Sequence, residues 1–274
     1  MANSGLIFNI LFLTLIGFIV LRYIYRFAEQ TYAETKNRPF YINFILIRRR
    51  LTKSQLYILR NQFSFYNKLS SKDRRIFEHR VATFINEKQF HTRQDLELTD
   101  EIKVLVAATA VKLTFGFRSY LLPIIRTILV YPEAFYSRMN EQLHKGEVNP
   151  QLGIIALSWK DFVEGYDDAN DNLNLGIHEF GHAIHLNSYK FSDVSAMIFR
   201  DCFMALKRYL RANEDIRRDL ISTRYFREYA YTNEFEFVAV LIECFIETPM
   251  EFKTKFPEIY NYVRRMLNFN FANY

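Results

Sequence analysis

The residues best suited to catalysis in this 274-residue chain form the run His178-Glu179-Phe180-Gly181-His182, an H-E-x-x-H pattern. Residues four apart lie on one face of a helix, so His178 and His182 can bind the same metal ion with Glu179 beside them. This pattern is typical of a catalytic Zn²⁺ site, which has three protein ligands and leaves a fourth position for water. In such a site Glu179 takes a proton from water whose pKa the ion lowers.

The surrounding sequence favours a helix over about residues 173–187. Asn172 or Asn174 can cap its first turn, and apolar residues cover the sides away from the histidines. Gly181 lies inside this helix, where glycine costs up to about 1 kcal/mol relative to alanine. We therefore expect another element to pack closely against the helix at Gly181.

A third metal ligand must come from elsewhere in the chain. His185 shares the helix face but lies about 10 Å along the axis from His178, too far for one ion to bridge easily. A second helix, which Asn233 can cap, offers Glu234 and Glu236 in its first turn. Glu234 is most simply a carboxylate that stabilises the helix dipole, whereas Glu236 is costly to bury unless it is paired or bound to metal. The residues favour Glu236 and leave Glu234 open.

The positive charge of the chain is local. Of 36 Lys and Arg and 30 Asp and Glu, residues 22–60 contain nine basic and two acidic residues, and residues 61–274 contain 27 and 28. The larger part is close to neutral, so no nucleic-acid partner is expected. The composition, half of it apolar, excludes a disordered or collagen-like chain. Phosphate-loop, dinucleotide and serine-hydrolase motifs are absent from the sequence.

An apolar segment at the N-terminus predicts a transmembrane helix over residues 5–25. No Lys or Arg precedes the segment, which favours a retained anchor over a signal peptide. Because the positive charge follows it, the positive-inside rule places the rest of the chain in the cytoplasm as a single-pass membrane protein. Cys202 and Cys244 fit a reducing compartment. The triplet 48–50, all arginine, is expected either to contact anionic headgroups or to lie on a solvated helix face.

Hydrophobic periodicity predicts one helix-rich α+β domain over residues 43–274, joined to the membrane helix by a basic juxtamembrane tether, residues 26–42. Two β-rich runs are expected as strands, at 127–131 and 152–159. An Asp- and Asn-rich run at 167–172 resembles the start of a calcium loop, but Leu173 stands where that loop needs glycine, so a polar loop is expected instead. The expected helices lie near 43–68, 73–90, 99–115, 173–187, 193–211, 233–247 and 256–267.

Five segments in this order resemble the Mlc titration factor A family of zinc-dependent peptidases, whose active site is similar to that of the lethal-factor-type zincins. The resemblance covers roughly residues 45–270. It implies a zincin-like peptidase domain with one Zn²⁺ ion, in which Glu236 is the third ligand and Tyr229 stabilises the oxyanion. The segments are ILVYP (128–132), IALSW (155–159), NLGIHEFGHAIH (174–185), YAYTNEFEFVAV (229–240) and TPMEFKTKFPEIYNYV (248–263).

The resemblance also implies a place for the substrate. The strand at 154–159 matches the edge strand of the family beside the cleft, so an extended peptide could pair with its backbone. The residues expected to bind substrate in this way are Ile155, Ala156, Leu157 and Ser158. Two features depart from the family: His185 stands where an acid is usual, and the best-known members lack an anchor.

Together these observations predict a membrane-anchored zinc metallopeptidase that hydrolyses peptide or protein substrates. The alternative prediction is a membrane-anchored binding module that sequesters a transcriptional regulator, because the family is known for such a contact. In that alternative the zinc ion mainly holds the fold.

Overall fold

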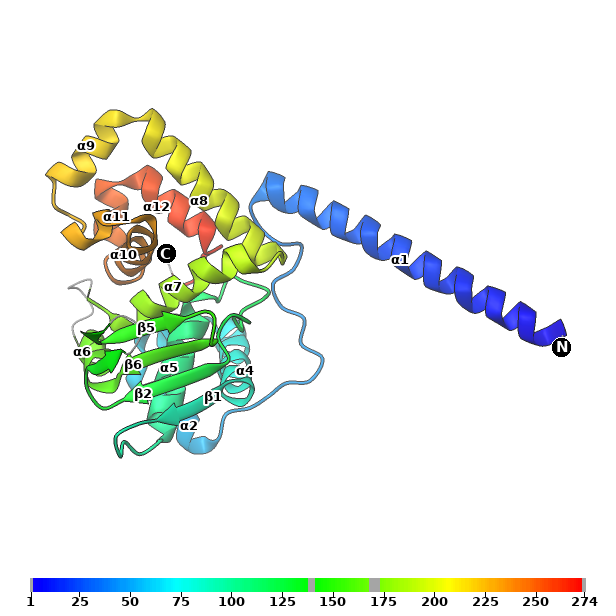
Figure 1. Ribbon diagram of the computed structural model, residues 1–274, viewed down its shortest axis with the longest axis horizontal. Coiled ribbons are helices and arrows are strands. Elements are labelled where there is room, and N and C mark those ends of the chain that lie inside the picture. The colour runs from blue at the N-terminus through cyan, green and yellow to red at the C-terminus, as the bar shows by residue number, and fades with distance from the viewer. Residues whose placement is uncertain (1, 138–140, 168–172, 273–274) are drawn as a thin grey trace.

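The computed structural model describes residues 2–137, 141–167 and 173–272 (Figure 1). Most of the Asp- and Asn-rich run, including the alternative cap Asn172, lies outside the described residues. In these ranges the helices are α1 (Ala2–Lys36), α2 (Lys53–Gln62), α3 (Ser64–Lys68), α4 (Ser71–Glu87), α5 (Asp100–Leu113), α6 (Trp159–Asp167), α7 (Leu175–Lys190), α8 (Val194–Ala212), α9 (Glu214–Ser222), the 3-10 turn η1 (Glu228–Tyr231), α10 (Glu234–Glu247), α11 (Pro249–Lys255) and α12 (Pro257–Met266).

A four-stranded sheet has the order β1-β2-β6-β5. Its strands are β1 (Gln89–Thr92), β2 (Thr127–Tyr131), β6 (Ile154–Ser158) and β5 (Gly146–Asn149). β1, β2 and β6 run parallel, and β5 pairs antiparallel with β6. A separate hairpin joins β3 (Phe135–Ser137) and β4 (Gln142–His144). This confirms the expected combination of many helices with a small sheet.

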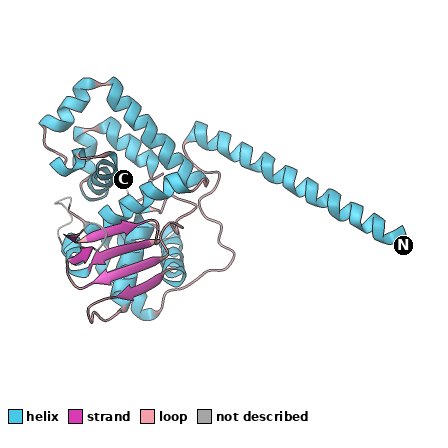
Figure 2. Cartoon of the chain, in the orientation of Figure 1, coloured by secondary structure: helices cyan, strands magenta, loops and turns pink. Residues whose placement is uncertain are grey.

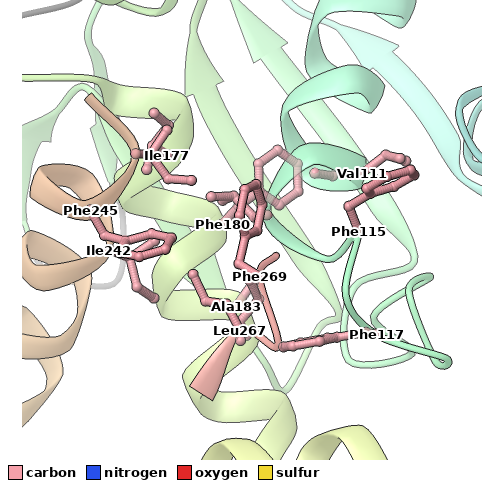
Figure 3. Close-up of a cluster of buried hydrophobic side chains, with 14 of the residues drawn as sticks. Val111, Phe115, Phe117, Ile177, Phe180, Ala183, Ile242, Phe245, Leu267 and Phe269 are labelled. Atoms are coloured by element: carbon pink, nitrogen blue, oxygen red, sulfur yellow. The ribbon is translucent and has the colours of Figure 1, made fainter. Parts of the chain in front are cut away.

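The sheet and the C-terminal helices form two halves of the molecule, with α7 between them (Figure 2). α7 packs on β5 and β6 on one side and on α8 and α10 on the other. Figure 3 shows the core at this junction, where Phe180 of α7 lies among Val111 of α5, Ile242 of α10 and Phe269 near the C-terminus. Since α7 carries the H-E-x-x-H residues, the metal-binding motif is built on a helix packed on both sides.

The first helix is longer than the expected membrane segment. α1 is a continuous helix to Lys36, so residues 26–36, expected as part of a tether, are helical. From Ile7 onward it is long and apolar enough to cross a membrane. Near its end Glu29 and Ala33 are buried against the domain, and the Glu29 carboxylate forms an ion pair with Arg118. The helix is therefore joined to the domain by side-chain contacts as well as by the chain.

The helix expected near 43–68 begins later than predicted. Thr52 caps α2 through a reciprocal pair of hydrogen bonds with Gln55, and the residues before Thr52 run as an irregular segment. The apolar residues 44–47 are exposed, so they find none of the core contacts that would hold them in a helix.

Candidate metal centre

Local packing fixes the direction and position of α7. The Asn174 side chain caps the helix by accepting a hydrogen bond from the backbone of Ile177 at 3.0 Å, as predicted. The expected close approach at Gly181 is also present, because a Cβ there would lie 3.3 Å from the Cα of Ala239 in α10. α7 and α10 can therefore cross with their backbones close together, which brings side chains of both helices to one point.

The second helix is capped as the sequence predicts. The Asn233 side chain accepts hydrogen bonds from the backbone N–H groups of Phe235 and Glu236, each at 2.9 Å. This starts α10 at a defined residue and turns Glu236 toward α7. Glu234 lies on another side, where its carboxylate pairs with Lys207 at 2.7 Å in a largely exposed position.

Three side chains converge between the two helices. The Nε2 atoms of His178 and His182 lie 3.1 and 3.4 Å from Oε2 of Glu236. One ligand atom from each residue falls within 4.8 Å of the other two. The cluster thus contains Glu236 and not Glu234.

The donor set fits a shared cation. Oε2 of Glu236 is buried and, within the described residues, has no aligned hydrogen-bond partner despite its closeness to both imidazoles. A buried carboxylate oxygen in this situation needs a positive partner. Two imidazole nitrogens and one carboxylate oxygen are ligands that divalent metals such as Zn²⁺ accept.

The charges around the cluster favour a cation as well. Burial lowers the pKa of His178, but the close carboxylates of Glu236 and Glu243 outweigh this and raise it to about 10. For Glu236, burial raises the pKa, but the two imidazoles close to its carboxylate outweigh this and hold the pKa well below its usual range. Without a bound ion, a proton on His178 thus compensates the negative charge of the nearby carboxylates.

His178 is oriented by a residue that sequence reasoning did not assign. Its Nδ1 lies 3.2 Å from Oε2 of Glu243, a fully buried carboxylate that also pairs with Arg227. A hydrogen bond from Nδ1–H to Glu243 turns Nε2 toward Glu236, as carboxylates behind metal-binding histidines commonly do. The sequence does contain a signal for Glu243, because this residue follows Glu236 by two helical turns on an otherwise apolar face.

Glu179 lies beside the cluster in a cavity of about 410 Å³. Burial, assisted by nearby carboxylates, raises its pKa to about 8. Gly146 at the start of β5 lies against it, since a Cβ there would lie 2.5 Å from Oε1 of Glu179. The outer strand β5 therefore determines on which side of the cavity the Glu179 carboxylate lies.

Tyr229 lies on the rim of the same cavity. It belongs to η1, its side chain is about half exposed, and its ring centroid lies 6.4 Å from that of His178. Burial and the nearby Glu236 carboxylate raise its pKa to about 12. The phenol therefore keeps its proton at neutral pH and can donate a hydrogen bond into the cavity.

His185 is separate from the cluster, in a pocket of aromatic rings. Phe203 lies 5.1 Å and Phe235 5.9 Å from its ring centroid. Burial lowers its pKa to about 4, so the imidazole is neutral at pH 7. Phe235 also stacks on His182 at 3.7 Å between ring centroids, and thereby connects this pocket with the metal-binding side.

The expectation that the strand at 154–159 is an edge strand is wrong. β6 lies inside the sheet, with Ile155 opposite both Ile128 of β2 and Val148 of β5. The backbone of Ile155, Ala156, Leu157 and Ser158 is thus already flanked by strands on both sides. Among the described strands, β5 is the outer one on this side. The sequence missed β5 because GEVN is short and polar and depends on its pairing with β6.

Two imidazoles and a carboxylate that converge, with a second carboxylate beside them, are an arrangement that metallopeptidase sites share. The chain belongs to the glucose-regulated metallo-peptidase M90 family, whose model matches residues 34–267. This confirms the resemblance to the Mlc titration factor A family. The chain is also similar to the uncharacterized protein slr2042 of Synechocystis sp., with 27% identity over 224 residues that cover 76% of this chain and 81% of that protein.

Proposed function

We propose that this protein is a membrane-anchored zinc metallopeptidase with a zincin-like domain over about residues 43–274. The observation that carries the proposal is the convergence of His178, His182 and Glu236 beside a cavity that His178 and Glu179 line. Membership of a metallopeptidase family supports a peptide or protein substrate. A motif helix packed beside a sheet with an antiparallel outer strand supports the zincin-like fold.

His178, His182 and Glu236 would hold the ion, with Glu243 orienting His178. When bound, Zn²⁺ supplies Lewis acidity, which lowers the pKa of water and polarises the substrate carbonyl. Beside a bound cation the raised pKa of Glu179 falls again, so that its carboxylate takes the proton of the attacking water and passes it to the leaving amine. Tyr229 donates a hydrogen bond to the oxyanion that develops on the substrate carbonyl.

The substrate backbone lies along β5 rather than along β6. Gly146, the first residue of β5, lies against the Glu179 side chain. A peptide that pairs with the outer edge of β5 therefore runs past the proposed base and the metal ligands. This backbone pairing favours an extended peptide over a small ester substrate.

The proposed membrane span is residues 5–25 within α1, with the domain in the cytoplasm. Its support is the length and apolar character of α1 and the basic residues that follow it. Reporters fused to the two ends test the orientation, and a C-terminus that is reached only from outside the cell contradicts it.

The first test replaces the proposed base. Glu179→Gln in the full chain should keep the metal and lower kcat by about 10²–10⁴-fold, because it removes only the proton acceptor. Glu164→Gln is the matched control, since Glu164 lines the same cavity but is exposed. Metal analysis and a peptide-library assay with and without chelator measure both properties. Unchanged cleavage by Glu179→Gln contradicts the mechanism, and an intact cellular role without cleavage would favour the binding module.

The second test addresses the ligand set. Glu236→Gln should reduce zinc content at least tenfold, because the cluster loses its only anionic ligand. Glu234→Gln, two residues earlier on the same helix, should keep the parent zinc content, because Glu234 pairs with Lys207. Zinc per protein after dialysis against a weak chelator separates the two variants. The reverse result reassigns the third ligand.

A further inference from the structure

Residues 37–47 bring the chain back along α1 after the helix ends. Asn37 adopts a positive φ of 50° and reverses the chain. Phe40 then packs its ring on Tyr32 and on Tyr25, with centroids 4.7 and 6.1 Å apart. Tyr25 precedes Lys36 by three helical turns, about 16 Å along the axis. Phe40 therefore lies beside the end of the proposed membrane span.

Four apolar side chains follow in the loop Phe44–Ile47. Their exposed fractions are 74, 39, 83 and 84% along the sequence. Four consecutive exposed apolar residues on a soluble surface are unusual and typically mark a contact site. Figure 1 shows the connection between α1 and α2, to which this loop belongs, running along the side of the domain toward which α1 leaves.

Both ends of the loop are held by the domain. Arg80, almost fully buried, donates hydrogen bonds to the carbonyl of Ile42 at 3.2 Å and to Oδ1 of Asn43 at 2.8 Å. After the loop, the backbone N–H of Arg49 donates to Nδ1 of His79 at 2.9 Å. The apolar loop is thus held in place on the domain at both of its ends.

The side of the domain that faces α1 is fixed too. Glu29 pairs with Arg118, with Oε2 and Nη2 2.9 Å apart, and the backbone N–H of Arg118 donates to Oγ of Ser195 in α8 at 3.0 Å. The guanidinium of Arg118 also lies 4.8 Å from the ring centroid of Tyr41, at the base of the returning chain. One arginine therefore links α1, α8 and the segment that carries the loop.

We propose that Phe44–Ile47 insert into the boundary between headgroups and acyl chains of the membrane that α1 crosses. This inference rests on the proposed span of α1 and adds a second membrane contact to it. The membrane is the occupant that the structure favours, because Phe40 packs on Tyr25 at the end of the span. Arg118 also links Glu29, one helical turn further on, with Tyr41 at the base of the loop. The contact is apolar rather than ionic, since Arg48 and Arg49 already pair with Glu78 and Glu87.

The test attaches a nitroxide to the full chain in vesicles of phosphatidylcholine and phosphatidylglycerol. Leu46→Cys supplies the labelling site, and the native Cys202 and Cys244 are buried. Leu15→Cys in α1 is the bilayer reference, and Met250→Cys on α11, 70% exposed, is the aqueous reference. The label at position 46 should collide more often with oxygen, which concentrates in lipid, than with a water-soluble nickel chelate, as at position 15. At position 250 the preference should be reversed.

The proposal is overturned if the label at position 46 collides mainly with the nickel chelate while the label at position 15 collides mainly with oxygen. If the label at position 15 collides mainly with the nickel chelate, the membrane span is contradicted, and the proposal with it. The metal-content and cleavage tests of the proposed peptidase do not depend on either result. Protection from both reagents together with dipolar broadening between labels identifies a second copy as the occupant, which also overturns the proposal. Ile47→Cys provides a second reading at a neighbouring, equally exposed residue.

Discussion

Single residues decide what the centre can bind. The two histidines could be predicted because their spacing and the helix cap are local in sequence. The residues favoured Glu236 but left Glu234 open, and the family resemblance assigned Glu236 as the third ligand. Glu243 could not be assigned a role in this way, since its role depends on Nδ1 of His178, 65 residues earlier. The same holds for His185, whose surroundings come from α8 and α10.

Burial of neutral His185 gives a prediction for stability at low pH. Its folded pKa is about 4 and its unfolded value is about 6.5, so below pH 6.5 the unfolded chain gains a proton that the folded chain does not. Stability should therefore fall as pH decreases from 6.5 toward 4, and the His185 contribution to this loss is about 2 kcal/mol by pH 5.

The measurement is the unfolding temperature of the full chain in detergent at pH 7 and pH 5. His185→Phe should show a smaller difference between the two pH values than the parent. His91→Phe, at an exposed site, should behave like the parent. Equal pH dependence in all three proteins would show that His185 does not contribute.

At the scale of elements, the strands show where sequence reasoning succeeds and fails. β2 and β6 were predicted because they are rich in apolar and β-branched residues, and both lie inside the sheet. The outer strands β1 and β5 are short and partly polar, and pairing with a neighbour holds them extended. Strand order is a long-range property, so β6 was mistaken for an edge.

The contact between β5 and α7 predicts an effect of Gly146→Ala. The added methyl group would overlap the Glu179 carboxylate, so this side chain must shift. We expect kcat to fall about tenfold to a hundredfold while zinc content stays at the parent level, because small displacements of a catalytic group are costly. Gly17→Ala, where a Cβ meets nothing within 4 Å, is the control. If Gly146→Ala keeps the activity of the parent, β5 does not determine the position of the Glu179 carboxylate.

At the scale of the whole molecule, α1 and the domain form one unit. The composition after residue 25 indicated a tether, because its charged and polar residues suit an exposed segment. The contacts of Glu29 and Ala33 are made with residues far along the chain, and such contacts leave no local pattern.

Breaking the link between α1 and the domain should loosen the segment after α1. Glu29→Gln removes the charge that pairs with Arg118, so trypsin should cut after Lys36 several-fold faster, because cleavage requires local opening. Glu34→Gln is the control, since Glu34 is exposed and accepts a hydrogen bond from exposed Gln30 on α1. Digestion of the vesicle-bound chain gives the rates. Equal rates in both variants would mean that the ion pair does not hold the segment.

The direction of α7 has a consequence for the choice of substrate. The helix begins at the metal centre and ends close to α8, where α1 docks, so the cleft lies on the side of the domain away from the membrane helix (Figure 1). His178 precedes Lys190 by about 18 Å along the axis. In the proposed orientation the scissile bond is held at a set height above the bilayer. A membrane protein would reach it only through an extended stretch of at least about five residues, at about 3.3 Å per residue, whereas a soluble protein needs no such reach.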